Sequence, residues 1–238
     1  MNTTIQPTPA SLPADSIQPS RRAMDDASRV LHWLLALSFA GAWLTAEAEG
    51  WRLVHVSLGY LAAGTLVLRG VWGLLGPRAA AWSVWARRVA SLPQTRSHGA
   101  WQGLAVLLML ALMGLAASTG VAQDLAATAL NETVCDALGE VHEFAGNTAL
   151  LAVGAHLALV LWGTLLLKQN RLRAMLTGRV PGLGPDVSPA HRSVAVLILL
   201  AAVGFGVWQA VGGDARLGLQ AVAAAEQHEH DHGDAHDD

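Results

Sequence analysis

The sequence has few charged residues for its length. Asp, Glu, Lys and Arg make up 14% of the 238 residues, whereas 53% of the side chains are hydrophobic. Soluble domains carry about 25% charged residues, so this chain lacks the polar surface that a water-soluble protein needs. The net charge of −3 at pH 7 is too small to favour nucleic acid or another polyionic partner. The composition therefore predicts an integral membrane protein.

Cysteine is almost absent as well. Cys135 is the single cysteine, which excludes an intramolecular disulfide and a cysteine-rich metal site. Residues 1–22 contain four prolines with scattered Ser and Thr, and they lack the apolar core of a signal peptide. We expect these residues to form a disordered cytoplasmic tail.

Five segments are long and apolar enough to cross a membrane, since a helical span needs roughly 20 mostly apolar residues. They cover about residues 29–46, 53–75, 99–120, 139–167 and 193–212. The first four are well defined, and the fifth is shorter but carries no charge. The sequence predicts an all-α integral membrane protein, with a four-helix transmembrane bundle and a fifth transmembrane helix. No connecting loop is long enough to form a catalytic domain.

The loops between these segments alternate in charge. One set is basic and contains Arg21, Arg22, Arg29, Arg78, Arg87, Arg88, Arg96, Lys168, Arg171, Arg173 and Arg179. The other set contains Glu47, Glu49, Asp124, Glu132 and Asp136, with Arg52 as its cation. Because basic loops remain on the cytoplasmic side, we expect a multi-pass protein of the bacterial inner membrane with its N-terminus in the cytoplasm and its C-terminus in the periplasm.

Histidines occur inside the apolar segments, where ionisable side chains mark functional sites by default. There are four of them: His32, His55, His142 and His156. A single one would as readily be a packing or interfacial residue. However, His142 and His156 are 14 residues apart, which is close to four helical turns, so both point the same way about 21 Å apart. In the predicted topology His142 lies at the depth of His55, and His156 at the depth of His32.

Two facing pairs of imidazoles suit two planar macrocycles, each with one imidazole above and one below its iron. The chain has no C-x-x-C-H motif, so such a haem would be held without thioether bonds. Three glycines lie within about a turn of the histidines: Gly59, Gly146 and Gly154. They leave room for a porphyrin face, although small residues are also common wherever membrane helices touch.

Other polar residues leave two readings open. Arg69 lies 14 residues after His55, so its guanidinium either pairs with a propionate of the inner haem or snorkels to the cytoplasmic interface. His98 is either an interfacial residue or a residue near the inner haem or a quinone. The tail contains His228, His230, His232 and His236 among carboxylates, and it is either a solvated segment or a binder of divalent metals.

With these residues in place, the chain resembles the bacterial cytochrome b561 and hydrogenase b-type cytochrome family. The resemblance covers about residues 24–180 and rests on R-V-L-H-W, W-R-L-V-H-V-S-L-G-Y, V-H-E-F-A-G-N with a histidine 14 residues on, and N-R-L-R-A-M-L-T-G-R. It implies a four-helix bundle with two b haems, the outer one on His55 and His142 and the inner one on His32 and His156. It also implies a quinone pool, or a dehydrogenase or hydrogenase subunit, as partner. A periplasmic c-type cytochrome would be a suitable acceptor.

We therefore expect four segments along the chain. They are a disordered tail (1–22), a cytochrome b561-like four-helix domain (23–180), a linker with the fifth transmembrane helix (181–212) and a His/Asp-rich disordered tail (213–238). The domain would embed in the lipid bilayer and serve as an electron-transfer protein or a cytochrome subunit of an oxidoreductase, not as an enzyme on its own.

A divalent metal-ion transporter is the alternative, because intramembrane histidines and a His/Asp-rich tail would also suit a cation path. The carboxylates nearest to the spans argue against it. Glu140 and Glu143 lie only at the outer rim of the fourth span, whereas a cation that crosses a bilayer needs charge compensation along its path.

Overall fold

The fold is described from a computed structural model. It covers residues 19–233 except 78–79, 96, 127–129, 169–170, 184 and 187–188, with only the backbone at 49, 126, 171 and 213–233. Five helices in this range are long and apolar enough to cross a membrane: α1 (Asp26–Leu44), α2 (Arg52–Leu75), α5 (His98–Ala126), α6 (Glu132–Leu165) and α8 (Arg192–Gly233). The predicted all-α membrane fold, including the fifth transmembrane helix, is confirmed.

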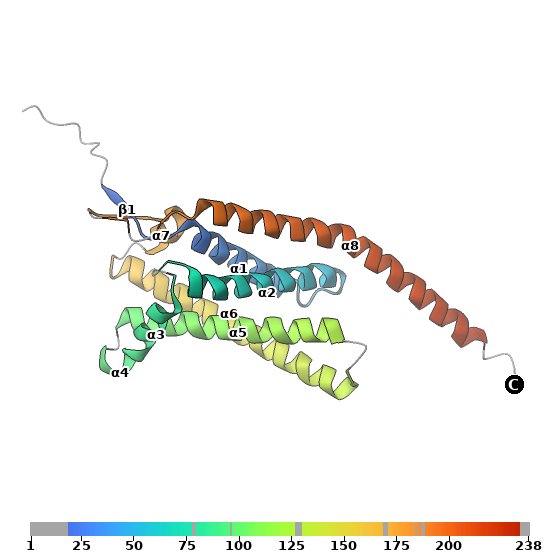
Figure 1. Ribbon diagram of the computed structural model, residues 1–238. Helices are drawn as coiled ribbons and strands as arrows, with labels where there is room; N and C mark the ends of the chain where they lie inside the picture. Colours follow the sequence, from blue (N-terminus) through green and yellow to red (C-terminus); the bar gives the residue numbers. More distant parts are fainter. Residues whose placement is uncertain are drawn as a thin grey trace, which may run out of the picture.

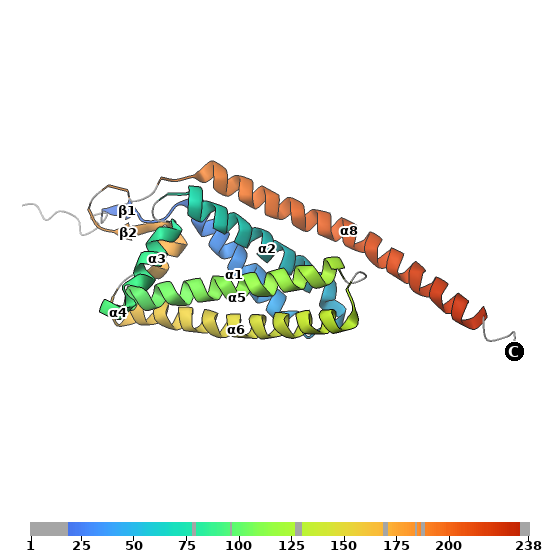
Figure 2. The same ribbon diagram turned by 60° about the horizontal axis from the view of Figure 1, so that its bottom comes forward.

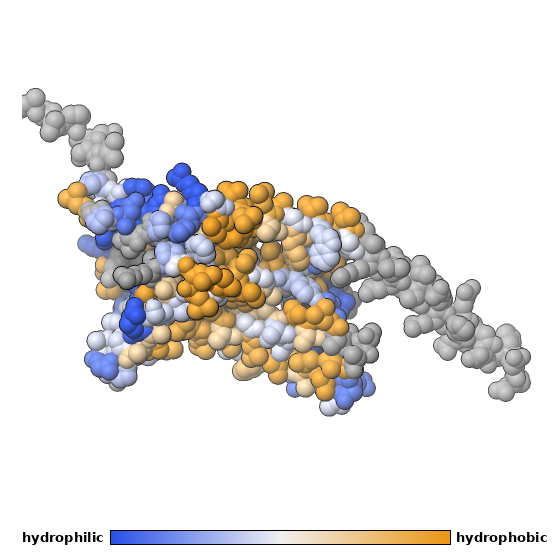
Figure 3. Space-filling model, in the orientation of Figure 1, coloured by the Kyte–Doolittle hydropathy of each residue, from blue (hydrophilic) through white to orange (hydrophobic). Residues whose placement is uncertain are grey.

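The first four long helices form two antiparallel hairpins. Helix α1 packs along α2, α5 packs along α6, and the two hairpins meet where α2 touches α5 (Figure 1, Figure 2). We call the end where α1 begins the proximal end, and the end where α1 ends and α2 begins the distal end. Figure 3 shows a hydrophobic surface over the middle of the bundle and hydrophilic residues towards both ends, as expected of a bundle within a bilayer.

The core of the bundle lies midway between its ends. A cluster of small and flexible side chains joins the four helices: Leu35, Ala62, Met109, Met113, Ala149 and Ala152. Small residues allow the backbones of membrane helices to approach closely. Ala149, which is fully buried, is seven residues from both His142 and His156, so this core fills the layer between the two histidine levels.

Short elements close the proximal end of the bundle. The strands β1 (Ser20–Arg22) and β2 (Arg179–Pro181) pair in antiparallel fashion, and α7 (Arg171–Thr177) precedes β2. The Arg29 side chain donates to the backbone carbonyls of Met175 and Leu176 at the end of α7. The 3-10 turn η1 (Glu49–Trp51) links α1 to α2, while α3 (Trp82–Ala90) and α4 (Leu92–Thr95) lie between α2 and α5.

Helix α8 departs from the prediction in its length. The sequence predicts a disordered tail from residue 213, but the backbone remains helical through Gly233. The run from Ala215 to Gln227 is rich in Ala, with Leu and Gln, and has no proline, a composition that favours helix. The 42-residue helix would be about 63 Å long, twice the roughly 30 Å of a bilayer's apolar core. Residues 234–238 lie outside the described residues.

The predicted N-terminal tail also needs a correction. Ser20–Arg22 belong to the predicted tail 1–22 but form β1, because they pair with a strand that lies far away in the sequence. Residues 1–18 lie outside the described residues. The remaining domain boundaries stay predictions.

Candidate functional site

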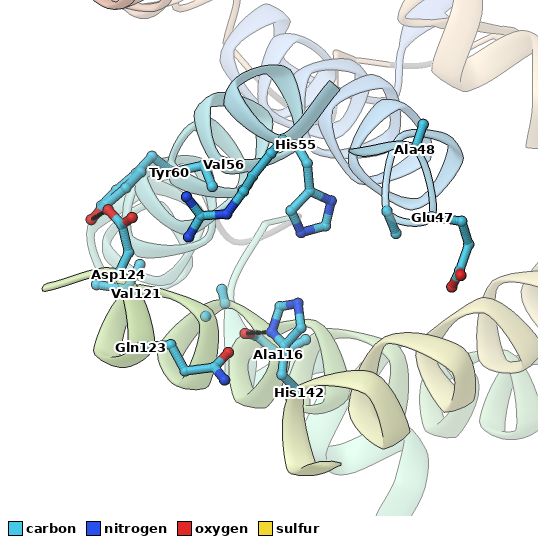
Figure 4. Close-up of a pocket in the computed structure, with 15 residues that line it drawn as sticks. Glu47, Ala48, His55, Val56, Tyr60, Ala116, Val121, Gln123, Asp124 and His142 are labelled. Carbon is cyan, nitrogen blue, oxygen red and sulfur yellow. Dashed lines mark hydrogen bonds between the residues drawn. The ribbon is translucent and has the colours of Figure 1, made fainter. Parts of the chain in front are cut away.

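Two histidines face each other across a cavity at the distal end of the bundle. His55 lies in the first turn of α2, and His142 lies in the first half of α6. Their ring centres are 6.0 Å apart, and the ring planes are inclined by 80°. Figure 4 shows the two imidazoles turned toward the space between them. The pairing of these two residues agrees with the depth that the sequence predicts for them.

Each of the two imidazoles is fixed by a backbone carbonyl. Nδ1 of His55 donates to the carbonyl oxygen of Ala42 in α1, and Nδ1 of His142 donates to that of Ala116 in α5, both at 2.8 Å. Because a carbonyl only accepts, the proton must lie on Nδ1, which leaves Nε2 unprotonated in the neutral ring. A histidine that binds a metal usually has this arrangement, with its second nitrogen donating to a carbonyl.

The spacing of the two rings matches what a shared iron requires. Imidazole nitrogen binds a metal at about 2.0 Å and lies about 1 Å from its ring centre, so two imidazoles on one iron stand roughly 6 Å apart. The separation of 6.0 Å between His55 and His142 fits this requirement. The distal pair therefore has the spacing and the tautomer for two axial ligands of one haem.

The cavity beside this pair has a volume of about 570 Å³ and is open on one side. Gly59 lines it, and a Cβ on this glycine would meet no atom within 4 Å, so the residue borders open space. The polar residues of the wall include Arg52 and Asp124. Asp124 accepts a hydrogen bond of 2.8 Å from the hydroxyl of Tyr60. A cavity of this size is in the range that proteins use for cofactors.

One residue of the distal site has no counterpart in the sequence prediction. A Cβ on Gly120 of α5 would lie 2.8 Å from Cε1 and 3.0 Å from Nδ1 of His142. This distance is too short for a real Cβ, so a glycine is required for α5 to pass beneath the imidazole. Gly120 is one of many glycines in the spans, and no local sequence pattern links it to a histidine on the next helix.

The other two histidines lie at the proximal level. His32 is in the second turn of α1, and His156 is in the second half of α6. His32 is close enough to His156 and to Arg69 to interact electrostatically with both. Nδ1 of His156 is buried and has no hydrogen-bond partner among the described residues.

Arg69 turns its guanidinium into the protein. One nitrogen donates to the carbonyl of Ala80 at 3.3 Å, and the guanidinium lies 5.0 Å from the ring centre of Trp82 in α3. The other terminal nitrogen, Nη1, is buried and has no partner in the described part of the chain. A buried donor without a partner requires an explanation, and a bound anionic group is one that fits. Both readings of Arg69 therefore stay open, because Ala80 and Trp82 lie in the proximal connection that follows α2.

The remaining predicted residues contribute less to these sites. A Cβ on Gly146 or on Gly154 would meet no atom within 4 Å, and neither residue lines the distal cavity. The ring of His98 packs over Gly163 of α6, and its Nε2 has no hydrogen-bond partner within the described residues. Among the described residues, no group of three or more His, Cys, Asp or Glu is arranged to hold a metal ion. His228, His230, His232 and His236 have no described side chains.

The fold and the distal site define a helical membrane protein with two imidazoles facing each other across a cofactor-sized cavity. Residues 23–178 match the family of the prokaryotic cytochrome b561, so the chain belongs to this family. No curated protein and no solved structure matches the chain. The chain is therefore a multi-pass b-type cytochrome that acts in electron transfer, and its cofactor is b-type haem. Helix α8 lies outside the matched residues.

Proposed function

We propose that this protein carries electrons across the bacterial inner membrane on two b haems, one at each level of the bundle. His55 and His142 would be the axial ligands at the distal level, and His32 and His156 those at the proximal level. The observation that carries the proposal is the distal pair, whose rings are 6.0 Å apart with both Nδ1 atoms hydrogen-bonded to carbonyls.

The distal residues prepare a site for low-spin iron. A bound b haem supplies an iron that takes up and releases one electron at a time. The carbonyls of Ala42 and Ala116 hold the two rings in one tautomer and make Nε2 more basic, which favours the oxidised iron. Gly59 leaves the space beside His55 open, and Gly120 lets the ring of His142 lie against α5.

The proximal residues supply a second set of ligands at another depth. His156 lies 14 residues after His142 on α6, about 21 Å further along the helix, so the two cannot share one iron. Arg69 has a buried guanidinium nitrogen free for an anionic group, and we propose that it binds a haem propionate there. The apolar core around Ala149 keeps water out of the layer between the two levels.

The orientation of the bundle in the bilayer is assigned from the loop charges. The proximal end carries the arginines of the connections that the positive-inside rule assigns to the cytoplasm. The distal site would then face the periplasm. We propose that a quinone pool or a dehydrogenase or hydrogenase subunit is one redox partner, and that a periplasmic c-type cytochrome is the other.

Electron transfer across vesicle membranes tests this function. Purified protein would be inserted into lipid vesicles that contain ferricyanide, and dithionite would be added outside as an impermeant donor. We expect the trapped ferricyanide to be reduced at a rate proportional to the protein content, and much more slowly with the His142→Ala protein. Equal rates with the two proteins, or a rate no higher than in protein-free vesicles, would contradict the proposal.

A further inference from the structure

Helix α8 lies outside the family match, but it packs against both helices of the first hairpin. Figure 1 shows α8 running along α1 and α2, and it contacts both of them. These two helices carry His32 and His55, one of the proposed ligands at each level. The contacts of α8 with this hairpin could therefore act on both levels, a role that rests on the proposed function.

One contact lies at the proximal level. Ile198 of α8 is 9% exposed and packs in a cluster with Ala27 and Leu31, and Leu31 directly precedes His32 in α1. The start of α8 is also tied to the start of α1. Nε of Arg192 is 3.5 Å from a carboxylate oxygen of Asp26, whose backbone N–H donates to the carbonyl of Ala190 at 3.0 Å. These contacts fix the first turns of α1 against α8.

A second contact lies at the distal level. Gln209 is only 9% exposed, and its Nε2 donates to the hydroxyl of Ser57 on α2 at 3.4 Å. Ser57 is two residues after His55. A polar side chain within a bilayer is costly unless it is paired, and hydrogen bonds between membrane helices help to hold them together. This bond therefore fixes the part of α2 that carries His55.

The two contacts are spaced like the two histidine levels. Ile198 and Gln209 are 11 residues apart, which is about 16 Å along a helix. The proposed ligands on α6 are separated by a similar distance, about 21 Å. Each contact of α8 therefore lies beside only one level, and its loss should affect only the haem site at that level.

We propose that α8 is a positioning helix for both haem sites, with Ile198 acting through α1 on His32 and Gln209 acting through α2 on His55. At the distal level the direction of the change in reduction potential can be predicted. The hydrogen bond from His55 to Ala42 joins α2 to α1, so it weakens when α2 is free to shift. A weaker bond makes the imidazole less basic and the oxidised iron less stable, which raises the reduction potential of the distal haem.

Redox titrations of the full-length protein test this assignment. We expect Gln209→Leu to raise the reduction potential of the distal haem and to speed dissociation of that haem about fivefold, which corresponds to the loss of one ordinary hydrogen bond. The potential and the dissociation rate of the proximal haem should not change. Ser57→Ala removes the same bond from the other helix and should have the same effect, so the test holds if Gln209→Leu does not fold. Ile198→Ala should shift the proximal haem alone.

Matched controls come from neighbouring residues of α8 that face away from the bundle. Trp208 is 60% exposed and Leu197 is 68% exposed, so Trp208→Leu and Leu197→Ala should leave both potentials unchanged. Lower thermal stability with unchanged potentials in Gln209→Leu, Ser57→Ala and Ile198→Ala would overturn the proposal and leave α8 a membrane anchor. Shifts of both haems in each variant would also overturn it. If the unaltered protein binds no haem, it is the proposed function that fails.

Discussion

The distal and proximal sites differ in how completely the protein prepares them. At the distal level both histidines already have a carbonyl partner, and their rings stand 6.0 Å apart. At the proximal level Nδ1 of His156 and Nη1 of Arg69 are buried without partners among the described residues. The helices thus preorganise the distal site, whereas the buried polar atoms of the proximal site would be satisfied only by the haem that we propose there.

The positions of the ligands within the hairpins explain part of this difference. His55 is near the start of α2, where it faces the last turn of α1. The carbonyl of Ala42 lies in that last turn and also accepts from the hydroxyl of Thr45 at 3.1 Å, so the imidazole shares it with the end of the helix. His142 reaches the carbonyl of Ala116 inside α5, where Gly120 leaves room for its ring, whereas Nδ1 of His156 has no such partner among the described residues.

Replacement of the ligands should have the largest effect on the two sites. We expect His55→Ala and His142→Ala to disturb the same haem, and His32→Ala and His156→Ala to disturb the other one, because His142 and His156 are about 21 Å apart. The disturbed haem should become high-spin or be lost, while the other stays low-spin. Low-temperature spectra during redox titration would measure this. A match between His55→Ala and His156→Ala would contradict the proposed pairing.

A single methyl group should break the distal site and spare the proximal one. Gly120→Ala places a Cβ 2.8 Å from the ring of His142, which must then move away from its carbonyl partner. Overpacking of this kind costs about 1–3 kcal/mol, so the distal haem should be bound much less tightly. Gly114→Ala is the matched control on the same helix, since its Cβ would meet no atom within 4 Å. The haem content of the two purified variants measures this effect, and equal haem content would contradict the close contact between Gly120 and His142.

An effect of similar size is expected when the proximal site loses its cation. Arg69→Gln should weaken the binding of the proximal haem by about 1.5–3 kcal/mol, the range for a hydrogen bond to a charged group. It should also lower the potential of that haem, because a nearby cation favours the reduced iron. Arg69→Lys should restore part of the potential, and Arg87→Gln on the exposed face of α3 should have no effect. An unchanged proximal potential in Arg69→Gln would exclude the proposed propionate contact.

Labelling of Cys135 tests which side of the membrane the distal site faces. Cys135 lies in the first turn of α6, at the distal end, and is partly exposed. An impermeant thiol reagent should label it in intact spheroplasts, and Cys135→Ser should abolish the label. Labelling that requires inside-out vesicles would place the distal site on the cytoplasmic side and reverse the proposed orientation.

Much of the fold could be predicted because hydropathy reports directly on membrane spans. The predicted spans agree with the long helices within a few residues at most ends. The short helices and strands could not be predicted from hydropathy. Helix α3 is amphipathic and has no long apolar run, and the pairing of β1 with β2 joins residues about 160 positions apart.

The site was less predictable than the fold. The histidine pairs follow from depth, but the carbonyl partners of His55 and His142 depend on how the hairpins pack. The two readings of Arg69 had equal support in the sequence, because only the position of α3 and Trp82 shows where the guanidinium turns. The contact of Gln209 with Ser57 joins two spans that no sequence spacing relates.

The number of haems per chain tests the central claim of two sites most directly. The pyridine haemochrome of the purified full-length protein would be measured against its protein mass. Two sites at two depths predict two extractable b haems per chain, which reduce as two low-spin components. A single haem would leave one of the histidine pairs without its proposed role. The absence of haem, or haem that cannot be extracted because it is covalently bound, would contradict the account as a whole.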